Sequence, residues 1–176
     1  MSLPRLLAGT RPGAPLPRAE HLAVHGPCPR GDSELLERVN AAGLRGRGGA
    51  SFPTAVKLRS VAERPGRRFV LVNGAEGEPM SAKDRVLMQL APHLVLDGAL
   101  LAAEAIGASR VVVAVRDEAT AALGAMRGAV AERSLERRVS LRPVPSVYLA
   151  GEESALIRHL NGGPVKPTVV PPLPFE

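Results

Sequence analysis

The chain is poor in cysteine and in aromatic residues. Its 176 residues include one cysteine, Cys28, together with three phenylalanines, one tyrosine and no tryptophan. A single cysteine excludes an internal disulfide, and it leaves no cysteine cluster to hold zinc or an iron–sulfur centre. Aromatic residues make up 2% of the chain and hydrophobic residues 45%. We therefore expect a core of leucine, valine and alanine.

Long apolar runs and targeting signals are also missing. The most apolar stretch, residues 94–106, is interrupted by Asp97 and Glu104 and is too short to cross a bilayer. The amino-terminal residues contain prolines and lack the compact apolar centre of a signal peptide. The four histidines show no metal-ligand spacing, so no metal site is predicted. These features predict a cytoplasmic protein without direct insertion into a membrane.

The chain is basic, with a net charge of +6 and a pI near 10.6. A positive balance favours polyanionic partners in general. However, the basic residues are scattered, and single-strand binders need aromatic stacking platforms that this chain scarcely has. Nucleic acid is therefore not the expected partner. A basic nucleic-acid binder remains an alternative that would require arginines clustered on one face and strong salt dependence.

Apolar runs that read as buried strands alternate with helical patterns along most of the chain. The strands are expected at 68–73, 110–115 and 139–144, and helices at 32–42, 53–64, 82–90, 94–106, 118–132 and 151–160. This alternation predicts an α/β fold with a mainly parallel sheet covered by helices on both faces. Residues 32–176 are expected to form one domain. Residues 1–31 read as an extended leader rich in proline, glycine and arginine, with a short strand near Leu22 and Val24.

A glycine-rich loop at residues 43–54 separates the first two predicted helices. Its glycines allow positive φ and a close approach of backbone N–H groups to a ligand, and Pro53 suits a first helical turn. Such a loop before a helix amino terminus favours phosphate binding. It is not a dinucleotide-binding fingerprint, because Ser51 stands where the third glycine belongs and a helix precedes the loop. An empty mobile loop is the alternative.

Two further segments place acidic residues after buried strands or at a helix start. Residues 73–79 offer the amide of Asn73 and the carboxylates of Glu76 and Glu78, which suit hydroxyl groups or the edge of a ring. Their alternative is a solvated acidic turn. The second segment contains Tyr148, Gly151, Glu152 and Glu153. For its two acids, capping of a helix amino terminus is the alternative.

Taken in order, these motifs resemble a known family of flavoproteins. The segments GLRGRGGASFPT, NGAEGEP, KDR, APHL, YLAGEESAL and PPLP resemble the FMN-binding domain of the NADH-binding flavoprotein subunit of respiratory complex I, the NADH-quinone oxidoreductase. Related subunits occur in NAD-reducing hydrogenases and formate dehydrogenases. The resemblance runs from about Asp32 to Pro174. It implies an α/β domain that holds FMN without a covalent bond and receives hydride from NADH.

The resemblance also implies residue roles. The flavin phosphate and ring would contact Gly46, Arg47, Gly48, Gly49 and Lys57. The ribityl chain, ring and nicotinamide would contact Asn73, Glu76 and Glu78, with Tyr148, Gly151, Glu152 and Glu153 completing the site. Phe52 would stack on the NADH adenine, and Glu78 and Glu153 are the candidate catalytic residues. Electrons would pass on to a partner iron–sulfur subunit, which allows a position at the periphery of a membrane complex.

Several positions depart from the family pattern. Ala75 replaces an aspartate that contacts FMN, and Ser51 and Ala55 replace glycines near the flavin. Leu58 and Ser60 replace aromatic residues, so weaker NADH binding is expected. The family's ubiquitin-like and 4Fe–4S domains have no counterpart among the 176 residues. The alternative function is therefore a degenerate, non-catalytic paralogue or fragment that keeps the fold for assembly or binding.

Overall fold

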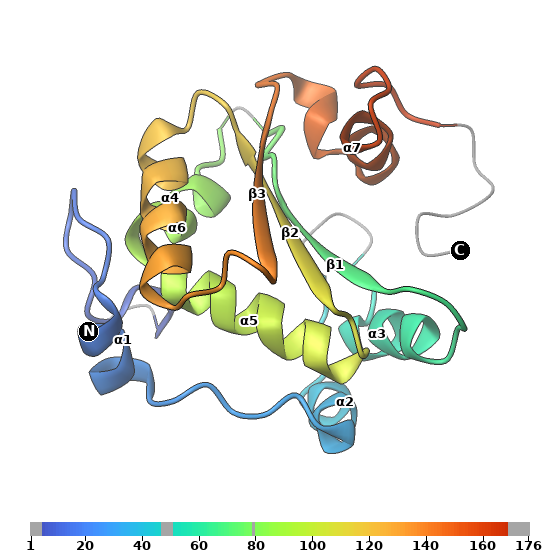
Figure 1. Cartoon of the computed structure of the whole chain (residues 1–176), viewed down its shortest axis with the longest axis horizontal. Helices are drawn as coiled ribbons and strands as arrows, with labels where there is room; N and C mark the ends of the chain where they lie inside the picture. Colours follow the sequence, from blue (N-terminus) through green and yellow to red (C-terminus); the bar gives the residue numbers. More distant parts are fainter. Residues whose placement is uncertain (1–4, 47–50, 79, 169–176) are drawn as a thin grey trace.

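A three-stranded parallel sheet forms the centre of the molecule (Figure 1). The computed structural model describes residues 5–46, 51–78 and 80–168. The strands are β1 (Phe69–Gly74), β2 (Arg110–Arg116) and β3 (Val139–Val144), in the order β1-β2-β3. Both pairings are parallel, so the three carboxyl ends lie along one edge of the sheet. The predicted α/β class and parallel sheet are confirmed.

One face of the sheet is covered by helices. Helices α5 (Pro92–Ala105) and α6 (Thr120–Glu132) pack on the strands, and α4 (Lys83–Leu90) packs on α6. Every second residue of β2 faces them, and these valines are buried together with helix side chains such as Leu96 and Met126. The core is therefore aliphatic, as predicted, with methionine filling part of it.

The opposite face is covered only near the carboxyl ends of the strands. There a short 3-10 helix, η2 (Tyr148–Gly151), and α7 (Glu153–Leu160) bury Ala114, Val144 and Leu156. Toward the other end Phe69 is 58% exposed, and Ser140 and Arg142 are exposed as well. Within the described residues, helices therefore flank both faces, as predicted, but they cover the second face less completely than the first. The burial of β3 alternates from Val139 to Arg142, which is the pattern of a strand with one solvated face.

The remaining helices precede the sheet. Helix α2 (Ser33–Ala41) begins after Asp32, whose carboxylate accepts a hydrogen bond from the Leu35 N–H at 3.0 Å. Gly43, with φ of 60°, follows its end, and α3 (Thr54–Ala62) starts after Pro53. All the predicted helices are present within a few residues of their predicted bounds. Capping residues, glycine and proline explain this agreement because they act locally.

The leader differs from its prediction. Residues Arg5–Leu7 form a 3-10 turn, η1, and Arg18–His25 form helix α1, so the predicted strand near Leu22 and Val24 is wrong. His21 of this helix and Leu16, two residues before it, are buried in the domain, where each is 3% exposed. His21 Nε2 lies 2.8 Å from the Asp97 carboxylate of α5. Tertiary contacts therefore decide the structure of this segment, while its predicted boundary at residue 31 stays a prediction.

No single helix among the described residues is long and apolar enough to span a membrane. Helices α4 and α5 would be long and apolar enough only if taken together, and a bend of 102° separates them.

Candidate functional site

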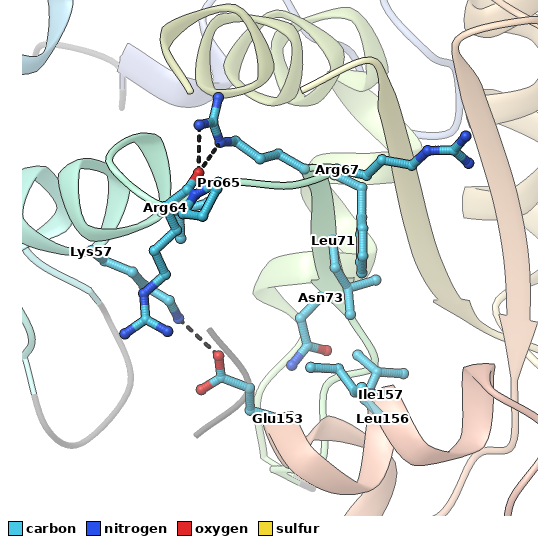
Figure 2. Close-up of a pocket in the computed structure, with 12 residues that line it drawn as sticks. Lys57, Arg64, Pro65, Arg67, Leu71, Asn73, Glu153, Leu156 and Ile157 are labelled. Atoms are coloured by element: carbon cyan, nitrogen blue, oxygen red, sulfur yellow. Dashed lines mark hydrogen bonds and ion pairs between the residues drawn. The ribbon is translucent and has the colours of Figure 1, made fainter. Parts of the chain in front are cut away.

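Two cavities meet at Asn73, the exposed residue near the carboxyl end of β1. The first has a volume of about 470 Å³ and lies between α3, β1 and α7 (Figure 2). Its wall is apolar where Leu71, Leu156 and Ile157 line it. Lys57 and Arg64 extend toward it from α3 and the following turn, opposite Glu153. The cavity thus combines an apolar surface with cationic groups.

The second cavity, of about 600 Å³, lies on the other side of Asn73. It is formed by the loop that follows β1 and by the segment around η2. Together the two cavities bring together most of the residues predicted for the site: Lys57, Asn73, Glu76, Glu78, Tyr148, Gly151, Glu152 and Glu153. These residues are up to 96 positions apart in the sequence, and the parallel topology explains why they converge.

The glycine-rich loop is described only at its two ends. Its neck is closed by hydrogen bonds from Gly46 N–H to the Phe52 carbonyl at 2.9 Å and from Thr54 N–H to the Leu44 carbonyl at 3.0 Å. Ser51 has a φ of 46°, a conformation that glycine adopts more readily. Phe52 is half exposed and, like Gly46, lines neither cavity. The predicted residues Arg47, Gly48 and Gly49 lie outside the described residues.

The two loops of the second cavity pack backbone against backbone. A Cβ placed on Gly151 would overlap the Ala75 carbonyl oxygen, and one on Gly77 would overlap the Tyr148 carbonyl oxygen. Neither position has room for a side chain, so the close packing of the backbones explains why glycine stands at both positions. The position of one loop therefore depends directly on the position of the other.

Asn73 links these loops through its side chain. Its Nδ2 donates to the Gly151 carbonyl at 2.8 Å, and its Oδ1 accepts from the Ala75 N–H at 3.1 Å. The predicted contact of Asn73 with a flavin remains a prediction. The geometry adds a second role, because this amide ties the loop after β1 to η2.

Glu76 is a buried carboxylate with several donors. Ser81 Oγ donates to its Oε1, and Lys83 Nζ lies 3.1 Å from the same oxygen. Burial would raise the pKa of Glu76, but the hydrogen bonds from Ser81 and Lys83 and the charge of Lys83 outweigh burial and lower it. Glu76 is therefore an ion that holds its own loop together. By contrast, Glu78 is exposed.

Replacing Glu76 by glutamine should reduce the sensitivity of folding to acid. Because the pKa of Glu76 is lower in the folded chain than its ordinary value of 4.5, the unfolded chain binds more protons between the two values. Its stabilisation is present above the ordinary pKa and is lost as the pH falls through the folded pKa. Urea unfolding from about pH 6 to about pH 3 should show a smaller loss of stability for Glu76→Gln than for the wild type. Parallel losses would contradict this assignment.

The paired acids of α7 have different partners. Glu152 caps the helix, because its carboxylate accepts from the N–H groups of Ser154 and Ala155 at 3.1 and 2.7 Å. Burial acts to raise the pKa of Glu152, and these bonds together with the Ser154 hydroxyl lower it. Glu153 instead pairs with Lys57 at 3.0 Å across the first cavity (Figure 2). The capping alternative thus describes Glu152, whereas Glu153 faces the cavity.

Ala75 is only 1% exposed and packs with Ala114, Val144 and Ala150. An aspartate placed here without other changes would bury a carboxylate among apolar side chains, which is unfavourable. Alanine therefore suits the apolar surroundings of position 75 in this chain.

Sequence reasoning missed the arginines beside the first cavity, among them Arg64 and Arg67. They belong to a short run, Arg64–Arg68, between α3 and β1. Arg68 Nη1 donates to the Ile106 carbonyl at 3.2 Å. The cluster of basic residues in a turn was visible in the sequence, but nothing local showed that this turn borders a cavity.

Comparisons with known proteins show which proteins this chain is similar to. The model of a family described as the Nuo51 FMN-binding domain matches residues 39–175. The NADH-quinone oxidoreductase of Aquifex aeolicus contains a subunit that is 32% identical over 156 residues, covering 81% of this chain and 37% of that protein. The corresponding protein of Escherichia coli is 35% identical over 156 residues, covering 80% of this chain and 35% of that protein.

Solved structures point the same way. An NAD+-reducing [NiFe]-hydrogenase in the air-oxidized state matches with a TM-score of 0.77 and 39% identity, over 89% of this chain and 29% of that chain. The H2-reduced state matches with a TM-score of 0.72 and 41% identity, over 81% of this chain and 26% of that chain. The chain spans little more than a third of the length of the curated relatives.

Proposed function

The chain belongs to the family of the Nuo51 FMN-binding domain, and we propose that it binds FMN in the two cavities at Asn73 and receives hydride from NADH there. The observation that carries this proposal is the convergence of the family's motif residues on these adjoining cavities. This convergence does not follow from closeness in the sequence, because the motifs come from three separate segments.

The chemistry of the donors fits FMN. Lys57 provides a positive charge at the first turn of α3, directly after the glycine-rich loop, where a phosphate is favoured by the helix amino terminus. Leu71, Leu156 and Ile157 provide an apolar wall for a ring system. The Lys57–Glu153 pair is about half exposed on both sides, so it can open for an anionic ligand at modest cost.

The remaining residues have roles in binding and orientation. We assign Lys57, with the glycine-rich loop at Gly46–Gly49, to the phosphate and ring of FMN. Asn73 and Glu76 shape the loop beneath the ribityl chain, and Tyr148 is 68% exposed beside the second cavity, available to a nicotinamide. Glu78 and Glu153 are exposed carboxylates that line the second and the first cavity, and they are the candidate catalytic groups. Phe52 is the candidate for contact with adenine.

Bound FMN would supply the electron chemistry, because a flavin accepts two electrons and releases them singly. The protein would contribute placement and charge. Transfer of the electrons to a partner iron–sulfur subunit, in a cytoplasmic or peripheral complex, belongs to the same proposal. The functions of the relatives support it, since these are NADH-quinone oxidoreductase subunits and an NAD+-reducing hydrogenase.

The alternative is a non-catalytic module that keeps the fold for assembly or binding. It is favoured by the internal bonds of Asn73 and Glu152, which already have protein partners. The buried Ala75, which stands where the family has an aspartate, also favours it.

An anaerobic titration with FMN, followed by NADH, separates the two functions. Saturable binding with loss of flavin absorbance after NADH addition is expected for the proposed function. Binding without this loss would restrict the function to flavin binding. An absence of binding would contradict the FMN proposal and favour the non-catalytic module.

Replacing Lys57 by alanine should weaken FMN binding by about tenfold, because one charge-assisted contact to the phosphate or ring is lost. The matched control is Arg59→Ala on the same helix. Arg59 pairs with Glu37 at 2.7 Å away from the cavity, so its loss should leave flavin affinity unchanged. The titration above measures both. Equal affinities for Lys57→Ala and Arg59→Ala would refute the assignment of Lys57.

A further inference from the structure

The central strand provides none of the predicted site residues, yet two side chains at its carboxyl end reach both loops of the site. Arg116 Nη1 donates to the Glu76 carbonyl at 2.6 Å. The next residue, Asp117, accepts a hydrogen bond from Ser146 Oγ at 2.7 Å. Glu76 belongs to the loop after β1, and Ser146 stands two residues before η2. Because β2 lies between β1 and β3, its end faces both segments.

Arg116 supports the loop after β1 from below. Its Nη2 pairs with Glu118 at 2.9 Å, which orients the guanidinium, and the side chain is 26% exposed. It lines a third cavity of about 520 Å³ beneath the loop and lies outside the two cavities at Asn73. Arg116 and Lys83 thus hold Glu76 at two separate points, its main-chain carbonyl and its carboxylate.

Asp117 supports the segment that leads to η2. Its carboxylate also accepts from the Glu118 N–H at 2.8 Å, and its own N–H donates to the Val144 carbonyl at 2.9 Å. The hydrogen bond from Ser146 is the main cause of the lowered pKa of Asp117. The turn after β2 is therefore attached to the end of β3 by both backbone and side chain.

We propose that Arg116 and Asp117 are positioning residues that hold the loop after β1 and the segment before η2 in register for flavin binding. The tight packing at Gly77 and Gly151 explains why this matters, since neither loop can shift without displacing the other. This inference rests on the proposed function for its effect on FMN. Its structural part, the placement of the loops, is measurable without flavin.

The test compares Arg116→Gln, Arg116→Lys and Asp117→Ala with Arg110→Gln. Arg110 is an exposed arginine at the opposite end of the same strand, so it controls for the loss of a charge on β2. Two quantities are measured on the full chain: the dissociation constant for FMN, and the backbone amide chemical shifts of Gly77 and Gly151 without FMN. Thermal midpoints show whether each variant is folded.

Arg116→Gln and Asp117→Ala should each weaken FMN binding by about tenfold, the usual effect of losing a hydrogen bond to a charged group. Each should also move the amide shifts, chiefly at Gly77 for Arg116→Gln and at Gly151 for Asp117→Ala. Arg116→Lys should recover part of the affinity because it keeps the charge, and Arg110→Gln should match the wild type. If Arg116→Gln does not fold, Asp117→Ala and Arg116→Lys carry the same comparison.

The outcomes separate this inference from the proposed function. If the wild-type protein binds no FMN, the proposed function is refuted. The amide shifts alone then test whether Arg116 and Asp117 position the loops. The other informative outcome is that the wild type binds FMN, and that Arg116→Gln and Asp117→Ala show its affinity and its amide shifts. That outcome overturns the positioning role and leaves the proposed function intact.

Discussion

Replacing Gly151 by alanine should separate the two loops at the site and weaken FMN binding by at least about tenfold. The new methyl group would overlap the Ala75 carbonyl oxygen and come within 3.1 Å of the Gly77 nitrogen. Both are backbone atoms, so the loops must move apart. The Asn73 amide, which donates to the Gly151 carbonyl, would lose its alignment. Overpacking of this kind costs about 1–3 kcal/mol of stability.

Gly128→Ala is the matched control for this substitution. Gly128 lies in helix α6, and a Cβ placed there meets no heavy atom within 4 Å apart from the adjacent backbone of its own helix. Alanine is favoured over glycine in helices, so this variant should gain up to about 1 kcal/mol and bind FMN like the wild type. Flavin titration and urea unfolding measure the two effects. Wild-type affinity in Gly151→Ala would show that the loop packing is not needed for binding.

Replacing Asp97 by alanine should have the largest effect on stability, a loss of about 3–5 kcal/mol. Asp97 lies between Arg133 and His21, with distances of 2.7 and 2.8 Å from its carboxylate oxygens. The side chains of all three are at most 13% exposed. Removing the carboxylate leaves the Arg133 guanidinium buried without its charged partner, and it removes the polar contact between His21 of α1 and α5.

Glu20→Ala provides the comparison for Asp97→Ala. Glu20 lies on α1 and pairs with Arg11 at 3.5 Å, but both side chains are well exposed. Exposed pairs of this kind contribute less than about 1 kcal/mol, so Glu20→Ala should be nearly neutral. Urea unfolding gives both values. If Asp97→Ala lowered the free energy of unfolding no more than Glu20→Ala, the contacts of Asp97 with Arg133 and His21 would have no role in holding the leader.

The leader and the turn after β2 show where sequence reasoning was incomplete. Residues 18–25 read as part of an extended segment because prolines and glycines surround them. Their helix depends on contacts of Leu16 and His21 with residues far along the chain. The role inferred for Arg116 was equally invisible, since its partner Glu76 is 40 residues away. A charged residue at the end of a strand carries no local signal of such a contact.

From residue 32 onward, the sequence by itself determined the order of helices and strands, the parallel sheet and the family. Capping residues, glycine, proline and apolar periodicity act over a few residues. Each family motif is a continuous stretch of sequence, so it can be recognised without the structure. The tertiary structure decided which groups meet: the Lys57–Glu153 pair across the first cavity, the burial of Ala75 and the use of Asn73 as a link between loops. These depend on contacts between distant residues, which exist only once strands β1 to β3 lie side by side and bring their carboxyl ends to one edge.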